Sequence, residues 1–119
     1  MIPKFRVWDK RRNEMYSPDE LTIQINGSEI LIALASSMHQ IFNYELMQST
    51  GLKDKNGVLI FEGDIVVNAY GDLCLVEWEG GGFVLTEHIS DYQYYINDSS
   101  NIEVRGNKFK NPELMRASE

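Results

Sequence analysis

Cysteine is almost absent from this chain of 119 residues, in which Cys74 is the only one. An internal disulfide is therefore excluded. Cys74 lies in an alternating apolar stretch, residues 73–76, and such a position favours a small core residue over a nucleophile.

Long apolar runs are also missing. No stretch approaches the roughly 20 apolar residues that a membrane helix needs, and the opening MIPKFRVWDKRR has no apolar segment followed by a small-residue cleavage site. The sequence thus predicts a cytoplasmic protein with no membrane partner. Because 43% of its residues are apolar and 11% are aromatic, the chain has enough apolar side chains to form one hydrophobic core. A single domain over residues 1–119 is therefore expected.

Positive charge is missing from a long part of the chain. Between Val58 and Val104 there is no Lys or Arg against nine acidic residues, and the whole chain has a formal net charge of −7. Nucleic-acid binding depends on neutralising phosphates with Lys and Arg. Nucleic acid is therefore not the expected partner of this region.

Positive charge gathers instead near the N-terminus, where residues 1–12 carry a net charge of +4. The only candidate binding residues that we identify are Arg6, Lys10, Arg11 and Arg12. A solvated turn that attracts the acidic remainder of the chain or a neighbouring subunit is the favoured interpretation. Direct nucleic-acid binding through the same four residues is the alternative.

Residue patterns typical of catalytic and metal sites are scarce. His39 and His88 are the only histidines and neither has metal-ligand spacing, while no group of glycines matches a phosphate-binding motif. We therefore predict no catalytic residue, no cofactor, no metal and no enzymatic activity. A metal-dependent hydrolase that uses Asp54, Glu62 and Asp64 is an alternative, but a structural role, in which Asp64 fixes a turn, is favoured.

Alternating apolar residues in the first half of the chain predict short strands. Residues 3–8 form a first strand that pairs with residues 15–16 across a polar turn. Residues 21–34 form the clearest hairpin, with Asn26 and Gly27 as the two positive-φ residues of its turn. Residues 35–45 fit a short helix or a loop, and we favour a loop that leads into a strand at 41–48.

The second half of the chain predicts a meander. An Asn56-Gly57 hairpin is followed by turns at residues 63–64, 71–72 and 80–82, with short apolar runs between them. Residues 91–96 fit a helical turn or an irregular edge, and 102–104 a closing strand. A short helix begins after Asn111, its expected N-cap.

These elements together predict a mainly β fold with a minor helical part. Residues 46–105 form a small SH3-like barrel or a curled antiparallel meander, preceded by N-terminal hairpins and followed by a short C-terminal helix. Exposed strand edges have to be covered, and pairing with copies of the same chain is one way to cover them.

Five segments spread along the chain resemble one known family. They are KFRVWDK, TGLKDKNG after Met47-Gln48, FEGDIV, VEWEGGGFVL and GNKFKNPEL, and they are similar to the YopX family of phage and prophage proteins. The resemblance implies a protein that is encoded by a phage or prophage, is made in the host cytoplasm and assembles into homo-oligomers, without an established activity.

The sequence therefore favours a non-enzymatic, homo-oligomeric binding or accessory module whose partner is a host or phage protein.

Overall fold

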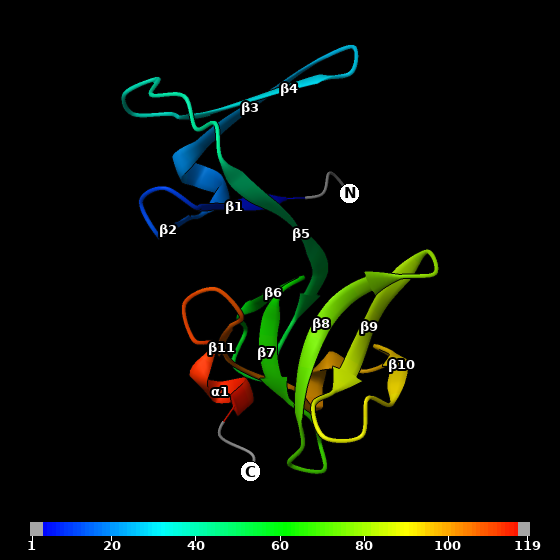
Figure 1. Cartoon of the computed structure of the whole chain (residues 1–119). Coiled ribbons are helices and arrows are strands. Elements are labelled where there is room, and N and C mark those ends of the chain that lie inside the picture. Colours follow the sequence, from blue (N-terminus) through cyan, green and yellow to red (C-terminus); the bar gives the residue numbers. More distant parts are fainter. Residues whose placement is uncertain (1–3, 117–119) are drawn as a thin grey trace. The chain divides into compact units, whose positions relative to one another are not determined.

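The computed structural model describes residues 4–116 and divides the chain into two compact units. The N-terminal unit comprises residues 4–47, and the C-terminal unit comprises the described residues from Gln48 onward (Figure 1). Each unit has its own hydrophobic core. The expected single domain over residues 1–119 stays a prediction. No helix within residues 4–116 has the length and hydropathy to cross a membrane.

The N-terminal unit is built from two hairpins. β1 (Phe5–Asp9) pairs with β2 (Glu14–Tyr16), and after the 3₁₀ turn η1 (Pro18–Glu20), β3 (Leu21–Asn26) pairs with β4 (Glu29–Leu34). β5 (Tyr44–Lys53) starts in this unit as the neighbour of β1 and ends in the C-terminal unit. The N-terminal core consists of Val7, Tyr16, Ile32 and Ile41.

The C-terminal unit is a curled antiparallel sheet that forms a half-barrel. Its strand order is β10-β9-β8-β7-β11, and β6 (Leu59–Phe61) pairs with the end of β5. The bounds are β7 (Asp64–Val67), β8 (Leu73–Glu79), β9 (Gly82–Glu87), β10 (Gln93–Tyr95), η2 (Ser99–Asn101), β11 (Glu103–Asn107) and α1 (Glu113–Arg116). The predicted mainly β fold and curled meander are confirmed.

Apolar residues that alternate along these strands make the C-terminal core. Ile60, Val66, Cys74, Val76, Leu85 and Ile102 are all buried and form one cluster. Cys74 is fully buried, which confirms its prediction as a small core residue. Trp78 continues the same face of β8 but is 52% exposed, because it pairs with Phe83 close to the turn of the β8–β9 hairpin.

Two predicted elements differ in their boundaries. The turn of the β3–β4 hairpin lies one residue later than predicted, because Asn26 still pairs with Glu29 and Gly27 alone of the two predicted residues has a positive φ, 62°. The strand predicted at 41–48 begins at Tyr44 and runs to Lys53. Its late start has a physical cause, since the amide of Ile41 is already used in a bond to the carbonyl of Ile32.

Two further predictions are decided near the C-terminus. Residues 93–95 are the edge strand β10, so the helical turn considered for 91–96 is wrong and the irregular edge is right. The short helix is confirmed but begins at Glu113. Asn111 does not act as its side-chain cap: the Asn111 Oδ1 atom accepts the amide of Asn107 instead and closes the preceding turn.

Candidate functional site

The basic turn between β1 and β2 is held in shape by one buried carboxylate. Asp9 is 6% exposed, and its Oδ1 atom accepts the amides of Arg11 at 3.0 Å and Arg12 at 3.3 Å. The amide of Asn13 bonds to the carbonyl of Asp9 at 2.8 Å, and Asn13 closes the turn with a φ of 55°. Asn tolerates this left-handed conformation better than most residues. The backbone thus presents two consecutive arginines at a fixed place.

The four predicted binding residues have different surroundings in the structure. Lys10 Nζ forms an ion pair with Glu45 at 2.7 Å, and the Lys10 amide bonds to the carbonyl of Asn43. Arg6 lies within β1 and is half-buried. Arg11 and Arg12 both line the pocket between this turn and residues 39–42, and Arg6 and Lys10 do not line that pocket. Binding through all four residues stays a prediction, but the structure brings only two of them together.

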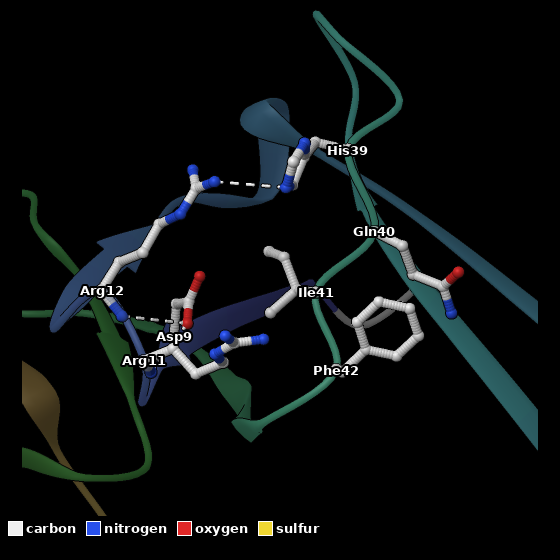
Figure 2. Close-up of a pocket in the computed structure, with 7 residues that line it drawn as sticks. All are labelled: Asp9, Arg11, Arg12, His39, Gln40, Ile41 and Phe42. Atoms are coloured by element: carbon white, nitrogen blue, oxygen red, sulfur yellow. Dashed lines mark hydrogen bonds between the residues drawn. The ribbon is translucent and has the colours of Figure 1, made fainter.

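The pocket has a volume of about 330 Å³ and lies within the N-terminal unit. It is lined by Asp9, Arg11 and Arg12 from the β1–β2 turn and by His39, Gln40, Ile41 and Phe42 from the segment before β5. Figure 2 shows Arg12 reaching toward His39 from the opposite side, Arg11 pointing away from Arg12, and the ring of Phe42 on the far side of residues 39–42 from Arg11.

One hydrogen bond joins the two sides of this pocket. The Arg12 guanidinium lies 3.2 Å from His39 Nε2. A guanidinium only donates, so Nε2 is the acceptor and the neutral ring carries its proton on Nδ1. Sequence reasoning missed residues 39–42 because they lie 27 or more positions from the turn and the only local signal was an ambiguous apolar pattern.

The three carboxylates considered for a metal site accept hydrogen bonds from backbone amides. Asp64 Oδ2 accepts the amide of Phe61 at 2.8 Å, and Glu62 Oε1 accepts the amide of Gln48 at 2.9 Å. Across residues 4–116, no three His, Cys, Asp or Glu side chains are grouped so as to hold a metal ion. Asp64 thus fixes the turn between β6 and β7, which is the role favoured for it from the sequence, whereas Glu62 joins this turn to β5.

Asp54 makes the most extensive of these contacts. Its side chain is 5% exposed; Oδ1 accepts the amides of Asn56 and Val58, each at 2.8 Å, and Oδ2 accepts the amide of Val104 at 2.9 Å. Burial opposes ionisation of Asp54, but the three amides, with a smaller contribution from Lys55, outweigh burial, so the pKa is lowered. The ionised carboxylate ties the β5–β6 turn to β11.

Nearly the whole chain matches one known family. The family described as YopX protein matches residues 4–116. The chain belongs to the YopX family. The resemblance inferred from five sequence segments is therefore confirmed.

Two solved structures are similar to this YopX-family chain. The crystal structure of protein EF1440 from Enterococcus faecalis has a TM-score of 0.68 and 30% sequence identity, and the match covers 97% of this chain and 99% of that chain. The X-ray crystal structure of protein yopX from Bacillus subtilis has a TM-score of 0.67 and 23% identity, covering 92% and 95%, and shows the same fold. No curated protein matches the chain.

The C-terminal unit of this YopX-family protein has a part-buried polar cluster around Asn68, in the turn between β7 and β8. The Asn68 Nδ2 atom donates to the Tyr94 hydroxyl at 2.8 Å, and Asn68 Oδ1 accepts the amides of Tyr70 and Asp72 at 2.9 Å each. Burial raises the pKa of Tyr94 to about 12 and also raises the pKa of the Cys74 thiol. A buried thiol with a raised pKa is a poor nucleophile.

Replacing Asn68 with Ala should lower the free energy of unfolding by about 2 kcal/mol, because two amides and a hydroxyl lose a part-buried partner. Tyr94→Phe removes only the hydroxyl and should cost less than Asn68→Ala. Urea unfolding of both variants measures the difference. Equal losses in the two variants would show that the amides of Tyr70 and Asp72 do not depend on Asn68.

Proposed function

We propose that this YopX-family protein is a non-enzymatic binding module that works as a homo-oligomer. The family resemblance supports a role as an accessory protein of a phage or prophage in the host cytoplasm. The absence of catalysis is supported by the contacts of its polar side chains. Asp54, Glu62 and Asp64 accept backbone amides, and the one thiol is buried.

The observation that carries the proposal is the hairpin β3–β4, which we call the arm. Its register pairs Leu21 with Leu34, Ile23 with Ile32, and Ile25 with Ile30, so that six apolar side chains share one face. At the base of the arm this face packs on the N-terminal core, but at its tip Ile25 is 69% exposed and Ile30 is 40% exposed. The apolar face thus continues beyond the core that covers it.

The backbone of the arm supports the same conclusion. β3 and β4 form a sheet of only two strands, which extends outward in Figure 1. In the described part of the chain, β4 has one further bridge, Ala33 with Gln40, near the base of the arm. Two-stranded hairpins are marginally stable in water and exposed edges invite pairing with another chain. A second arm would cover both the edge and the apolar tip.

The C-terminal unit supports a separate contact with a basic host or phage protein. Its β8–β9 hairpin carries Glu77, Glu79 and Glu87, whose carboxylates bond to neutral side chains: Thr86, Gln93 and Ser90 respectively. These three negative charges are therefore not neutralised by the described contacts and attract positive charge.

Replacing Ile25 and Ile30 together with Ser should dissociate the oligomer, because the arm tip loses its apolar surface. Sedimentation measures the mass: the wild-type chain should exceed 13.7 kDa, the mass of one copy, and the double variant should weaken assembly at least tenfold. Gln24→Ser, on the other face of β3, is the matched control and should leave assembly unchanged.

A wild-type mass of 13.7 kDa at 100 μM protein would refute the oligomer. An oligomer that survives in the Ile25→Ser, Ile30→Ser variant would refute the arm as its interface.

A further inference from the structure

A groove in the C-terminal unit lies between the turn that joins β7 to β8 and the segment that leads from β10 to η2. Two of the residues that line it, Leu85 and Ile102, belong to the buried core, and Ile96 packs against that core. Its volume of about 260 Å³ is below the range of about 300–1,000 Å³ that is usual for pockets of small-molecule ligands. The groove therefore fits one side chain of a partner protein better than a whole small molecule.

Two tyrosines also line this groove. Tyr94 is half-buried, and its hydroxyl accepts a hydrogen bond from Asn68 Nδ2 at 2.8 Å. Tyr70 is 88% exposed in the β7–β8 turn, where its amide bonds to Asn68 Oδ1. Burial is the main reason why the pKa of Tyr94 is raised to about 12, so its ring stays neutral. The face of a neutral aromatic ring attracts cations.

The groove is negatively charged. Asp98 is its one charged lining residue, and bonds from the hydroxyl and amide of Ser100 to Asp98 Oδ1, at 2.6 and 3.0 Å, lower the pKa of Asp98. Asp98 Oδ2 has neither a hydrogen bond nor an ion pair among the contacts of residues 4–116. Glu87 acts in the same direction, since its charge contributes to the raised pKa of Tyr94. Residues 58–104 contain no Lys or Arg that could offset these charges.

Two amide side chains at the groove have acceptor capacity to spare. Asn97 and Asn101 are exposed, and their side chains make no hydrogen bond to another residue in the described part of the chain. Lys55, whose amide bonds to the carbonyl of Ile102, does not neutralise the groove because its Nζ atom pairs with Glu103 at 3.6 Å. The groove thus suits a positively charged group that has several hydrogen-bond donors.

We propose that this groove binds an arginine side chain from a basic segment of a host or phage protein, with its guanidinium against Tyr70 and Tyr94 and bonded to Asp98 Oδ2. Arginine fits better than lysine, because a guanidinium stacks on aromatic rings, has five donors and is more weakly hydrated than an ammonium group. This inference rests on the basic partner proposed above and gives that partner a second site, separate from the carboxylates of the β8–β9 hairpin. It does not depend on the arm.

The test is an NMR titration of the full, isotope-labelled chain with three capped peptides of glycine and serine. The central residue of the peptide is arginine, citrulline or lysine, and citrulline has the shape of arginine without its charge. The arginine peptide should shift the amide signals of residues 68–70 and 94–102 saturably at millimolar concentration. The citrulline peptide should bind at least tenfold more weakly and the lysine peptide at least threefold more weakly.

The matched variants are Asp98→Asn and Asp91→Asn, which each remove one exposed negative charge without changing the size of the side chain. Asn is as good an N-cap as Asp, so Asp98→Asn retains η2, and Asn tolerates the φ of 59° at position 91. Asp98→Asn should weaken the arginine peptide about tenfold, the usual effect of losing a charged hydrogen-bond partner. Asp91→Asn should change its affinity less than twofold, because Asp91 does not line the groove. Tyr70→Leu removes the ring but keeps an apolar side chain and should weaken the same peptide about threefold.

Three results would overturn the proposal. The first is no saturable shift with the arginine peptide. The second is equal affinity for the arginine peptide and either of the other two. The third is equal loss in Asp98→Asn and Asp91→Asn, which indicates nonspecific attraction by the whole acidic surface.

A hexa-arginine peptide separates this proposal from the proposed function, and both Asp98→Asn and Glu79→Gln should weaken its binding. A loss in Glu79→Gln without a loss in Asp98→Asn would refute the groove and leave the basic partner of the β8–β9 hairpin in place. No binding of this peptide at low salt would refute both.

Discussion

Replacing Asp54 with Ala should lower the free energy of unfolding by about 4 kcal/mol, because three amides lose a charged acceptor. Such bonds contribute about 1.5–3 kcal/mol each, and the sum falls below this range because the amides are only part-buried and water replaces part of each bond. The amides of Asn56 and Val58 lie in the β5–β6 turn, and the amide of Val104 lies in β11. The variant therefore loosens two separate segments at once.

Urea unfolding of the wild type, Asp54→Ala and Asp54→Asn measures this effect. Asp54→Asn retains one oxygen for the turn amides but turns an NH₂ group toward Val104, so it should lose about half as much. Asp98→Ala is the matched control, because Asp98 also accepts an amide, from Ser100, but is exposed. An unchanged midpoint in Asp54→Ala would contradict the structural role of this carboxylate.

The contribution of Asp54 to stability should also depend on pH. Its pKa in the folded chain is lowered from the ordinary value of 3.8, so the folded state favours the ionised form. The contribution is fully present above pH 3.8 and is lost as the pH falls from there through the lower folded pKa. The difference in stability between the wild type and Asp54→Ala should thus be constant near neutral pH and shrink in acid.

Replacing Ile41 with Ala should lower the free energy of unfolding by about 3 kcal/mol, the usual cost of truncating a buried aliphatic side chain. Ile41 is 5% exposed and packs with Val7, Tyr16 and Ile32. Phe42→Ala removes a larger side chain from the next position but should cost less than about 1 kcal/mol, because that ring is 72% exposed.

The fluorescence of Trp8 follows this loss directly, because Trp8 is 9% exposed and lies in the N-terminal unit. A Trp78→Phe background removes the other tryptophan. Equal losses in Ile41→Ala and Phe42→Ala would contradict the observed packing. Comparing Trp78→Phe, which reports on Trp8, with Trp8→Phe, which reports on Trp78, also tests the predicted single domain, since coincident transitions show one cooperative unit.

Local chemistry explains why most strand boundaries in the C-terminal unit were predictable. Gly57, Gly63 and Gly71 have φ values of 81°, 88° and 86°, a conformation that glycine adopts without strain, and each marks a turn visible in the sequence. The β3–β4 hairpin was equally visible from its alternation. Its turn was predicted one residue too early because Asn-Gly strongly favours the two central positions of a hairpin turn. In the structure Asn26 instead pairs with Glu29 as the last residue of β3, and this pairing moves the turn by one residue.

The candidate site was predictable only in part, because its two sides are distant in the chain. Arg11 and Arg12 stood out by charge, whereas His39 and Phe42 belong to a segment whose apolar spacing fitted a helix as well as a strand. A helix would place Ile41 and Phe42 on one face. In the structure Ile41 is buried in the N-terminal core, whereas Phe42 is exposed to solvent.

The contact between Asp54 and Val104 joins residues fifty positions apart and sets the order of events during synthesis. The turn around Gly57 can form as soon as it leaves the ribosome, because the bonds from Asn56 and Val58 to Asp54 are local, whereas the Lys55 amide has its partner, the carbonyl of Ile102, much later in the chain. β11, which also completes the edge beside β7, emerges much later. Until residues 103–107 have been synthesised, the Oδ2 atom of Asp54 and the free edge of β7 in the nascent C-terminal unit therefore have no partner. During this period the unit is most accessible to proteases and chaperones.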